Sequence, residues 1–257
     1  MLNVESRNML QKLVPSGLVA TKSWLEVQGL NPHFIDNAVK SGTLISLTPG
    51  VYVRDPAPLL WKGIITSLQR MMQHPIHVGG LTALNLEGLA HYQLRCKSAS
   101  VQLYSIAPMP IWPSKINVNA QFVCHSTQRI WPESLMYEIK YLREEHWNES
   151  LPSLRYSTPE KAILEVLTEV PKTISFEHAD QLMQGLSTLS PRKMDELLRA
   201  CFSIKAKRLF MWLAERHNHA WFKYLKPDKY DFGSGKRELS RGGKLDNKWN
   251  ITIPREM

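Results

Sequence analysis

The hydrophobic pattern is most regular in the first fifth of the chain. Apolar residues at helical spacing predict three helices, over residues 3–13, 21–29 and 31–42. Two short β-type runs follow, at residues 43–47 and 51–54. Two helices followed by a tight hairpin are the order of a winged helix-turn-helix, so we expect that fold here.

The third of these helices has the clearest start and end. Asn31 is a good N-cap, and Pro32 suits the first helical position. Four apolar residues at three- and four-residue steps predict its buried stripe: Phe34, Ile35, Ala38 and Val39. Gly42 closes the helix, and the Pro49-Gly50 pair marks the hairpin turn.

The pattern changes after residues 55–58, which we interpret as a linker. Helical and strand-like segments then alternate, separated by turns that contain proline. The expected elements are helices over residues 59–72 and 81–89, an extended segment over 74–80, and strands over 101–106, 115–124 and 135–142. This composition predicts a small mixed α/β unit.

From residue 157 the pattern is almost entirely helical. The expected helices begin near Ser157 and cover residues 175–186, 190–201 and 203–217. The Gly- and Lys-rich end, residues 232–257, is expected to be an exposed arm. Within it Trp249, Ile251 and Ile253 alternate with polar residues, a pattern that would also suit an edge strand.

Together these patterns predict an α+β protein of three parts. Residues 1–56 would form the winged helix-turn-helix and residues 57–150 the mixed α/β domain. Residues 151–257 would form a mainly helical, basic region that ends in the Gly/Lys-rich arm.

Charge is concentrated at the C-terminal end. The formal net charge is +9, and residues 204–257 hold 13 Lys/Arg against 6 Asp/Glu. A basic face favours polyanionic partners through phosphate contacts. A solvated basic surface with no specific partner, or one that contacts an acidic protein, is the alternative.

The winged helix-turn-helix supplies the candidate DNA-binding residues, because its recognition helix enters the major groove. The polar face of the third helix offers Asn31, His33, Asp36, Asn37 and Lys40. Phosphate contacts are expected from Lys22 and Ser23 at the start of the second helix. Thr48 and Arg54 on the wing would reach either the DNA backbone or the minor groove. A winged helix that contacts protein instead is the alternative.

The charge of this module is modest. Residues 1–54 hold five Lys/Arg and three Asp/Glu, so we expect a second basic surface or a dimer to supply much of the affinity. The expected second surface is basic and aromatic: Lys205, Lys207, Arg208, Arg216, Lys223, Lys226, Lys229, Lys236 and Arg237, interleaved with Trp221, Phe222, Tyr224 and Tyr230. Of the aromatic residues, Trp212 and Trp221 are expected in the core.

The sequence contains no complete motif for catalysis or metal binding. Cys96, Cys124 and Cys201 have no CxxC spacing. The strings HNH at 217–219, GSGKR at 233–237 and EEH at 144–146 lack the flanking residues that a nuclease, a P-loop or a metal site needs. We therefore expect no enzymatic activity, no cofactor and no metal. The N-terminus has no signal pattern and no apolar run could span a bilayer, so a soluble, cytoplasmic protein is expected.

Four stretches together resemble the AbiEi family of type IV toxin-antitoxin antitoxins. They are SGTLISLTPGVY in the wing, HVGGLTALNLEGL at 77–89, STPEKAILEVL at 157–167, and the basic, aromatic RLFMWLAERHNHAWF. The resemblance implies an antitoxin of an abortive-infection, phage-defence system that also represses its own operon. Its partners would be inverted repeats in promoter DNA and a nucleotidyltransferase-type toxin, the latter without a stable complex, and the chain would be a monomer or weak dimer.

The sequence is also compatible with two other functions. One is a protein-interaction or RNA-binding module without operator recognition. The other is a nuclease or transferase whose site the sequence does not reveal.

Overall fold

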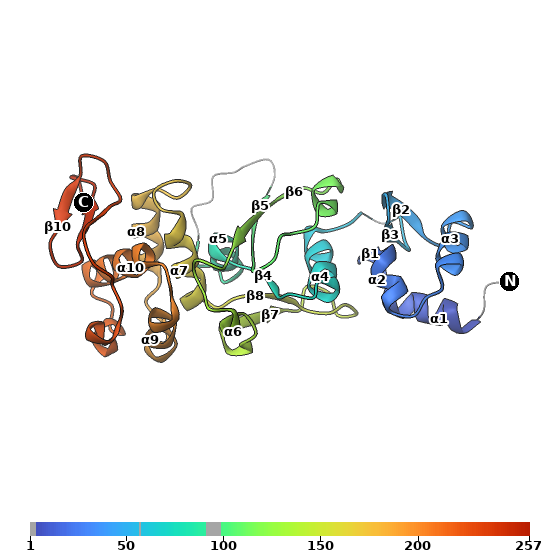
Figure 1. The fold of residues 1–257 in the computed structure, drawn as a ribbon, viewed down its shortest axis with the longest axis horizontal. Helices are drawn as coiled ribbons and strands as arrows, with labels where there is room; N and C mark the ends of the chain where they lie inside the picture. The colour runs from blue at the N-terminus through green and yellow to red at the C-terminus, as the bar shows by residue number, and fades with distance from the viewer. Residues whose placement is uncertain (1–3, 57, 91–98) are drawn as a thin grey trace.

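The chain runs from one end of an elongated molecule to the other (Figure 1). A computed structural model describes residues 4–56, 58–90 and 99–257. The N-terminal helices lie at one end, a five-stranded sheet lies in the middle, and helices and a small sheet form the other end. This is an α+β architecture. None of the described helices is long and apolar enough to cross a membrane.

The N-terminal module, residues 4–56, is three helices and a three-stranded antiparallel sheet. Its elements are α1 (Val4–Leu13), β1 (Ala20–Thr21), α2 (Lys22–Val27), α3 (Pro32–Lys40), β2 (Ile45–Thr48) and β3 (Val51–Val53). The strand order is β1-β3-β2. The module has its own core, in which Leu10, Leu25 and Ile35 are fully buried. The helices and the hairpin therefore lie where the hydrophobic pattern places them.

The module is fixed against helix α4 (Trp61–Met71) of the central part. Gly63 lies so close that a Cβ there would be 2.1 Å from the Gly17 carbonyl oxygen. The Val19 N–H donates to the Ser67 hydroxyl over 2.9 Å. The Arg70 guanidinium donates to the Leu13 carbonyl over 3.2 Å. These contacts fix the orientation of the module on the rest of the protein.

The central sheet has the strand order β6-β5-β4-β8-β7. Its strands are β4 (Ile76–Val78), β5 (Ala99–Ser105), β6 (Ala120–Ser126), β7 (Leu142–Glu145) and β8 (Leu154–Ser157), with α5 (Gly80–Leu86) after β4 and the 3-10 turn η1 (Trp112–Lys115) before β6. Strands β4 and β8 are parallel, as are β5 and β6, whereas β4 and β5 are antiparallel.

Two expected strands are placed differently. Residues 135–142 were expected as a strand, but helix α6 (Glu133–Met136) and the 3-10 turn η2 (Ile139–Tyr141) occupy most of them. Pro132 precedes this helical segment as its N-cap, and Leu135 and Met136 are buried side by side, which a strand could not do on one face. The strand expected from residue 115 begins only at Ala120.

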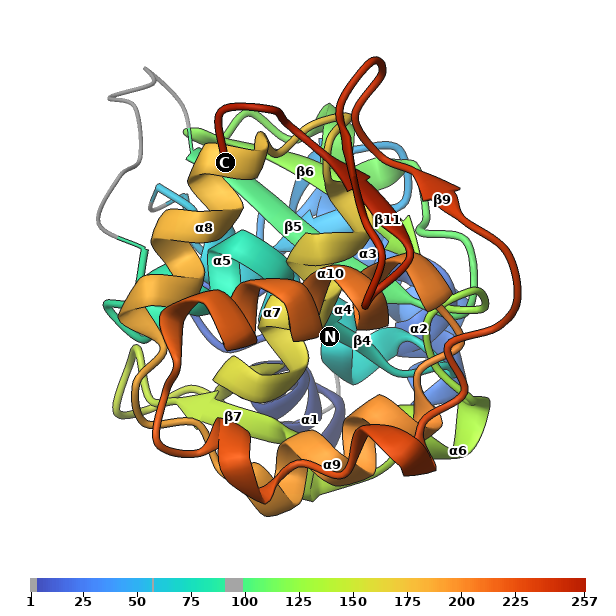
Figure 2. The same ribbon diagram turned by 90° about the vertical axis from the view of Figure 1, so that its left-hand side faces the viewer.

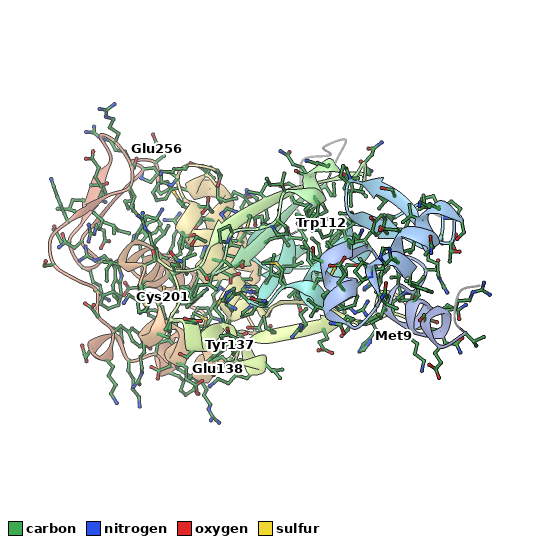
Figure 3. The ribbon with its side chains drawn as sticks, turned by 45° about the vertical axis from the view of Figure 1, so that its right-hand side comes forward. Met9, Trp112, Tyr137, Glu138, Cys201 and Glu256 are labelled. Atoms are coloured by element: carbon green, nitrogen blue, oxygen red, sulfur yellow. The ribbon has the colours of Figure 1, made fainter. Side chains whose placement is uncertain are left out.

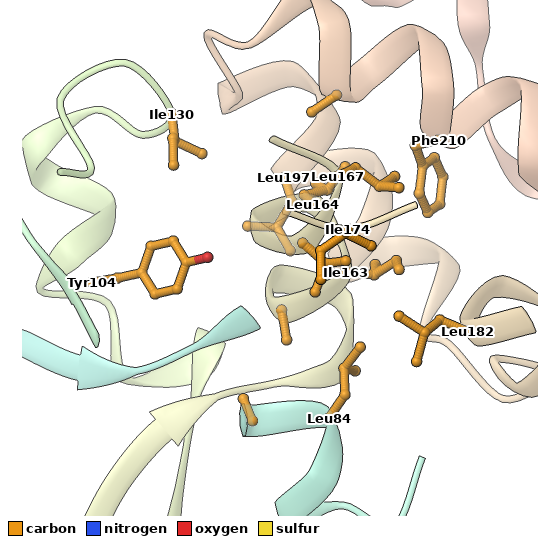
Figure 4. Packing of buried hydrophobic residues seen from close by; sticks show 14 of the residues in the cluster. Leu84, Tyr104, Ile130, Ile163, Leu164, Leu167, Ile174, Leu182, Leu197 and Phe210 are labelled. Carbon is orange, nitrogen blue, oxygen red and sulfur yellow. The ribbon is translucent and has the colours of Figure 1, made fainter. Parts of the chain in front are cut away.

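Four helices follow the sheet, and each begins after a Ser or Thr N-cap. They are α7 (Pro159–Glu169), α8 (Phe176–Gly185), α9 (Pro191–Ala200) and α10 (Ile204–His217). The hydroxyls of Ser175, Ser190 and Ser203 accept the backbone N–H three residues later, which stabilises each start. Figure 4 shows side chains of α7, α9 and α10 packed in one continuous core with residues of the central sheet.

The C-terminal end is a folded sheet, so the expectation of an exposed arm is wrong. The 3-10 turns η3 (Phe222–Tyr224) and η4 (Pro227–Lys229) lead to strands β9 (Arg237–Glu238), β10 (Lys244–Asp246) and β11 (Ile251–Ile253). Strand β11 lies in the middle of the order β10-β11-β9. Trp249, Ile251 and Ile253 are buried, and the Trp249 indole N–H donates to the Glu215 carboxylate of α10 over 2.8 Å. Figure 2 shows β9, β11 and α10 at the end of the molecule that faces the viewer.

A row of three rings crosses the central sheet. His77 on β4, Tyr104 on β5 and His125 on β6 are register neighbours, and their rings stack with centroids 5.9 and 4.8 Å apart. Helix α7 supplies a carboxylate to each end of the row. Glu165 lies 3.0 Å from His77 Nε2, and Glu169 lies 3.3 Å from His125 Nδ1. The row thus joins three strands to one helix.

Glu165 is fully buried and is the centre of a polar cluster, the Glu165 cluster. Its carboxylate accepts the Ser157 hydroxyl and the Gly80 N–H, each over 2.9 Å, and the Trp131 indole N–H over 3.4 Å. Burial opposes ionisation, but the pKa of Glu165 is lowered because His77, Lys161 and the Gly80 N–H favour the carboxylate. The carboxylate therefore ties α7 to β4, α5 and β8.

His77 gives the folded protein a specific pH dependence. Burial, helped by the nearby charge of Lys161, lowers the pKa of His77 to about 4. The unfolded chain binds this proton below about pH 6.5, the ordinary value for histidine, whereas the folded chain excludes it until about pH 4. The free energy of unfolding should therefore decrease as the pH is lowered from 6.5 to 4, with about 3 kcal/mol of the decrease due to His77.

We expect His77→Gln to flatten that dependence, because an amide can still donate to Glu165 but does not titrate. Urea unfolding at several values between pH 4 and 6.5 measures it. All other titrating groups are the same in the two proteins. The difference between their slopes of unfolding free energy against pH therefore reports His77 alone. Equal slopes in the wild type and in His77→Gln would contradict the assignment.

Candidate nucleic-acid interface

Helix α3 presents one polar face to solvent. Phe34, Ile35 and Ala38 are buried in the module core. The side chains of His33, Asn37 and Lys40 are exposed. Because they are four and three residues apart, they lie in one row along the helix. This row is the part of the predicted recognition surface that is free to meet a ligand.

Asn31 has a structural task at the start of α3. Its side-chain oxygen accepts the His33 N–H over 2.9 Å, as an N-cap does. Bidentate reading of an adenine needs both the oxygen and the nitrogen of an amide. Asn37, whose amide has no partner among the described residues, is therefore the better-placed base reader of the two.

Lys22 at the start of α2 forms an ion pair with Asp36 in the middle of α3. The ammonium lies 2.5 Å from the carboxylate, and both side chains are partly exposed. This hydrogen bond raises the pKa of Lys22 and lowers that of Asp36. The pair orients the two helices, but it also neutralises one of the few cations of the module.

The β2–β3 hairpin, which is the predicted wing, contacts the start of α2. Gly50 adopts a φ of 74° at the hairpin turn, a value that favours glycine. Its carbonyl accepts the Lys22 N–H over 2.8 Å, so the wing is attached to the start of α2. Ser23 is exposed, whereas Thr48 and Arg54 are half-buried. The predicted DNA-binding residues of the module thus belong to adjoining segments.

Only some of the residues predicted to form a basic surface at the C-terminal end are exposed. Lys223, Lys226, Lys229, Lys236 and Arg237 are exposed. Arg216 is exposed too, but its guanidinium lies 3.3 Å from Asp180 and donates to the Met257 carbonyl. The Lys205 ammonium donates to the carbonyls of Thr168 and Val170 at the end of α7.

Lys207 and Arg208 are not surface residues, and their prediction as such is wrong. Each is 2% exposed. The Arg208 guanidinium donates to four carbonyls, of Phe232, Gly233, Gly235 and Asn250, over 2.6–3.1 Å. These carbonyls lie 24–42 residues away in sequence, so no local pattern reveals them. Arg208 holds the C-terminal loop and sheet in place.

Some aromatic residues of this region are buried and others are exposed. Trp212 and Trp221 are buried, as expected, and so is Tyr230. Tyr224 is 60% exposed beneath the Lys223 ammonium, 5.1 Å from the ring centroid. Only Tyr224 and the half-buried Phe222 remain available to a partner among the aromatic residues predicted there.

Two further residues lie at this end of the molecule without any local signal in the sequence. Arg129 and Phe202 line the same groove as Lys236 and Arg237. Arg129 lies in the turn after β6, and Phe202 lies between α9 and α10. Neither belongs to a local motif, and only the packing of distant segments brings them together.

The catalytic-looking strings have structural roles. Asn218, with a φ of 47°, caps the end of α10, and His217 lies 2.8 Å from Asp180. The glycine-rich residues 233–235 turn carbonyls toward Arg208. Glu145 pairs with Lys62. Within residues 4–56, 58–90 and 99–257, no three His, Cys, Asp or Glu side chains could hold a metal together.

Cys124 and Cys201 are free thiols, and burial raises the pKa of both. Cys201 is buried near the start of α10, where Figure 3 labels it. Cys96 lies outside the described residues. Neither described thiol therefore has the lowered pKa of a reactive cysteine.

Two family models match the chain in succession. Residues 3–94 match a model described as transcriptional regulator, AbiEi antitoxin N-terminal domain. Residues 98–254 match one described as transcriptional regulator, AbiEi antitoxin, type IV TA system. No curated protein matches the chain.

A solved structure is similar to nearly the whole chain. The crystal structure of RV2827C protein from Mycobacterium tuberculosis superposes with a TM-score of 0.52, over 98% of this chain and 92% of that one. Its sequence is 13% identical. At that identity the likeness concerns the fold alone.

We expect Arg208→Met to loosen the C-terminal sheet, because four carbonyls lose their hydrogen bonds to the guanidinium. The free energy of unfolding should fall by about 2–4 kcal/mol. Hydrogen exchange should accelerate over residues 232–253 and not in the N-terminal module. Lys229→Met, which removes an exposed cation from the same end, is the matched control. Unchanged exchange in Arg208→Met would show that the four bonds do not hold this sheet.

Proposed function

Because the chain belongs to the AbiEi antitoxin family, the transcriptional regulators of type IV toxin-antitoxin systems, we propose that it binds its own promoter DNA and represses its operon. The N-terminal module would act as a winged helix-turn-helix, with α3 in the major groove and the β2–β3 hairpin beside it. The observation that carries this proposal is the exposed row of His33, Asn37 and Lys40 on a helix whose other face is fully used by the core.

The residues of this surface would have different tasks. Asn37 would read a base edge, and Lys40 would bind a guanine or a phosphate. Lys22, held by Asp36, and Ser23 would place the start of α2 against the backbone. Thr48 and Arg54 on the wing would contact adjacent phosphates, while Asn31 would act mainly as the cap of α3.

The low charge of the module supports binding by two copies. The Lys22–Asp36 pair leaves few free cations near α3, and the exposed cations of the C-terminal end lie at the opposite end of the long axis (Figure 1). A second chain on the other half of an inverted repeat would double the phosphate contacts. We therefore favour a pair of chains over a single chain whose two ends grip one half-site.

The antitoxin role would be directed at a nucleotidyltransferase-type toxin encoded beside this gene, without a stable complex between the two proteins. No enzymatic activity of the chain itself is part of the proposal. A downstream nucleotidyltransferase-like gene, with palindromes upstream of this gene, would support it.

Changing Asn37 and Lys40 to Ala should abolish sequence preference. Loss of one bidentate contact costs about 1–3 kcal/mol of discrimination, and loss of one phosphate contact lowers the salt dependence of binding by about one unit of slope. Gel shifts with the gene's own promoter and with random DNA measure both. Lys12→Ala on α1 removes the same charge away from α3 and should leave binding unchanged.

Two outcomes would contradict this proposal. One is normal repression by the double variant in a promoter-reporter assay. The other is equal affinity of the wild type for promoter and random DNA, which would favour the alternative of a protein-interaction or RNA-binding module.

A further inference from the structure

A groove of about 700 Å³ lies at the C-terminal end, at the opposite end of the molecule from α3. Three segments far apart in sequence form it: the turn after β6, the start of α10, and β9. The side chains that matter here are Arg129, Phe202, Lys205, Lys236, Arg237 and Glu238. Figure 2 shows α10 and β9 at the end of the molecule that faces the viewer.

The cations of this groove are free to bind a ligand. Arg129, Lys236 and Arg237 are exposed, and within the described part of the chain none of them forms an ion pair. Glu238 is the one acidic residue that lines the groove. The Lys205 ammonium donates to two backbone carbonyls, which are neutral, so it still adds a positive charge to the groove. The groove therefore presents an excess of positive charge to an anion.

The backbone that carries these cations is fixed before any ligand arrives. Arg208 holds the carbonyl of Gly235, next to Lys236, over 2.6 Å. The Arg237 N–H donates to the Asn250 carbonyl over 2.9 Å. A fixed backbone reduces the entropy that binding costs.

The groove also contains an aromatic ring. Phe202 is 56% exposed, although it lies between two helices of the core. Its N–H donates to the Ile130 carbonyl over 2.9 Å, which fixes it beside the turn that carries Arg129. An exposed ring beside phosphate-binding cations is the arrangement that proteins use to stack an unpaired base.

We propose that this groove binds single-stranded nucleic acid, with the base of one nucleotide on Phe202 and neighbouring phosphates on Arg129, Lys236 and Arg237. Duplex DNA would engage the cations but offers no free base face to the ring. The cations come from separate segments along an open groove, which suits a strand better than a lone nucleotide. The proposal goes beyond promoter reading and does not depend on it.

Fluorescence anisotropy of the full-length protein tests the proposal. The probe is a labelled 12-nucleotide RNA of mixed sequence, compared with single-stranded DNA and duplex DNA of the same sequence. Phe202→Leu keeps the apolar volume but removes the aromatic face. It should weaken binding of both single strands roughly tenfold and leave duplex binding unchanged.

The cations have a separate readout. Lys236→Ala with Arg237→Ala should lower the slope of log K against log salt by about 1.4, since each phosphate contact on a single strand contributes about 0.7. The matched control is Lys223→Ala with Lys229→Ala, which removes two exposed cations from the same end but outside the groove. The control should keep the wild-type slope. Thermal melts of all variants should match the wild type, because the changed side chains are exposed.

Three results would overturn the proposal. One is unchanged single-strand affinity in Phe202→Leu. Another is equal loss in the control variant, which would show diffuse charge attraction. The third is displacement of the RNA by duplex DNA, by a mononucleotide or by polyglutamate as readily as by unlabelled single strand. Promoter gel shifts with the Phe202 variant separate this site from α3. They should equal those of the wild-type protein, whether or not the wild type prefers its promoter to random DNA.

Discussion

The fold depends on one buried carboxylate. Glu165 has no access to water, so its charge is tolerable only because donors from β4, α5, β8 and the turn at Trp131 converge on it. The two stretches that supply His77 and Gly80, and Ser157 and Glu165, are among those on which the family resemblance rests. They meet in the core, so their likeness concerns the construction of the fold rather than the ligand surface.

Local chemistry was enough to place many elements in advance. An Asn or Ser followed by Pro fixed the starts of α3 and α9, and apolar spacing located α4, α10 and the N-terminal hairpin. Residues 135–142 were misplaced because a short apolar run fits a strand or a helical turn equally well. The chemistry of the C-terminal end was the least predictable. No local sequence pattern indicates that Arg208 is buried or that Phe202 is exposed, since both depend on how distant segments pack.

The rigid connection through α4 has a functional consequence. Gly63 against the Gly17 carbonyl leaves no space for a side chain, so the N-terminal module cannot turn on the core without breaking this contact. Met9 and Glu256 mark opposite ends of the molecule in Figure 3. A ligand on α3 and a ligand in the C-terminal groove would thus be bound at two separate sites, which allows one chain to hold promoter DNA and a single strand at once.

Hydrogen exchange of the full-length protein, with and without duplex DNA from its own promoter, tests the promoter-reading role of α3 most directly. It reports every segment in one experiment. We predict that the duplex slows exchange over α3 and the β2–β3 hairpin, residues 31–54, and leaves residues 199–239 unchanged. Protection confined to the C-terminal end, with α3 unchanged, would contradict the assignment of α3 as the DNA-reading helix.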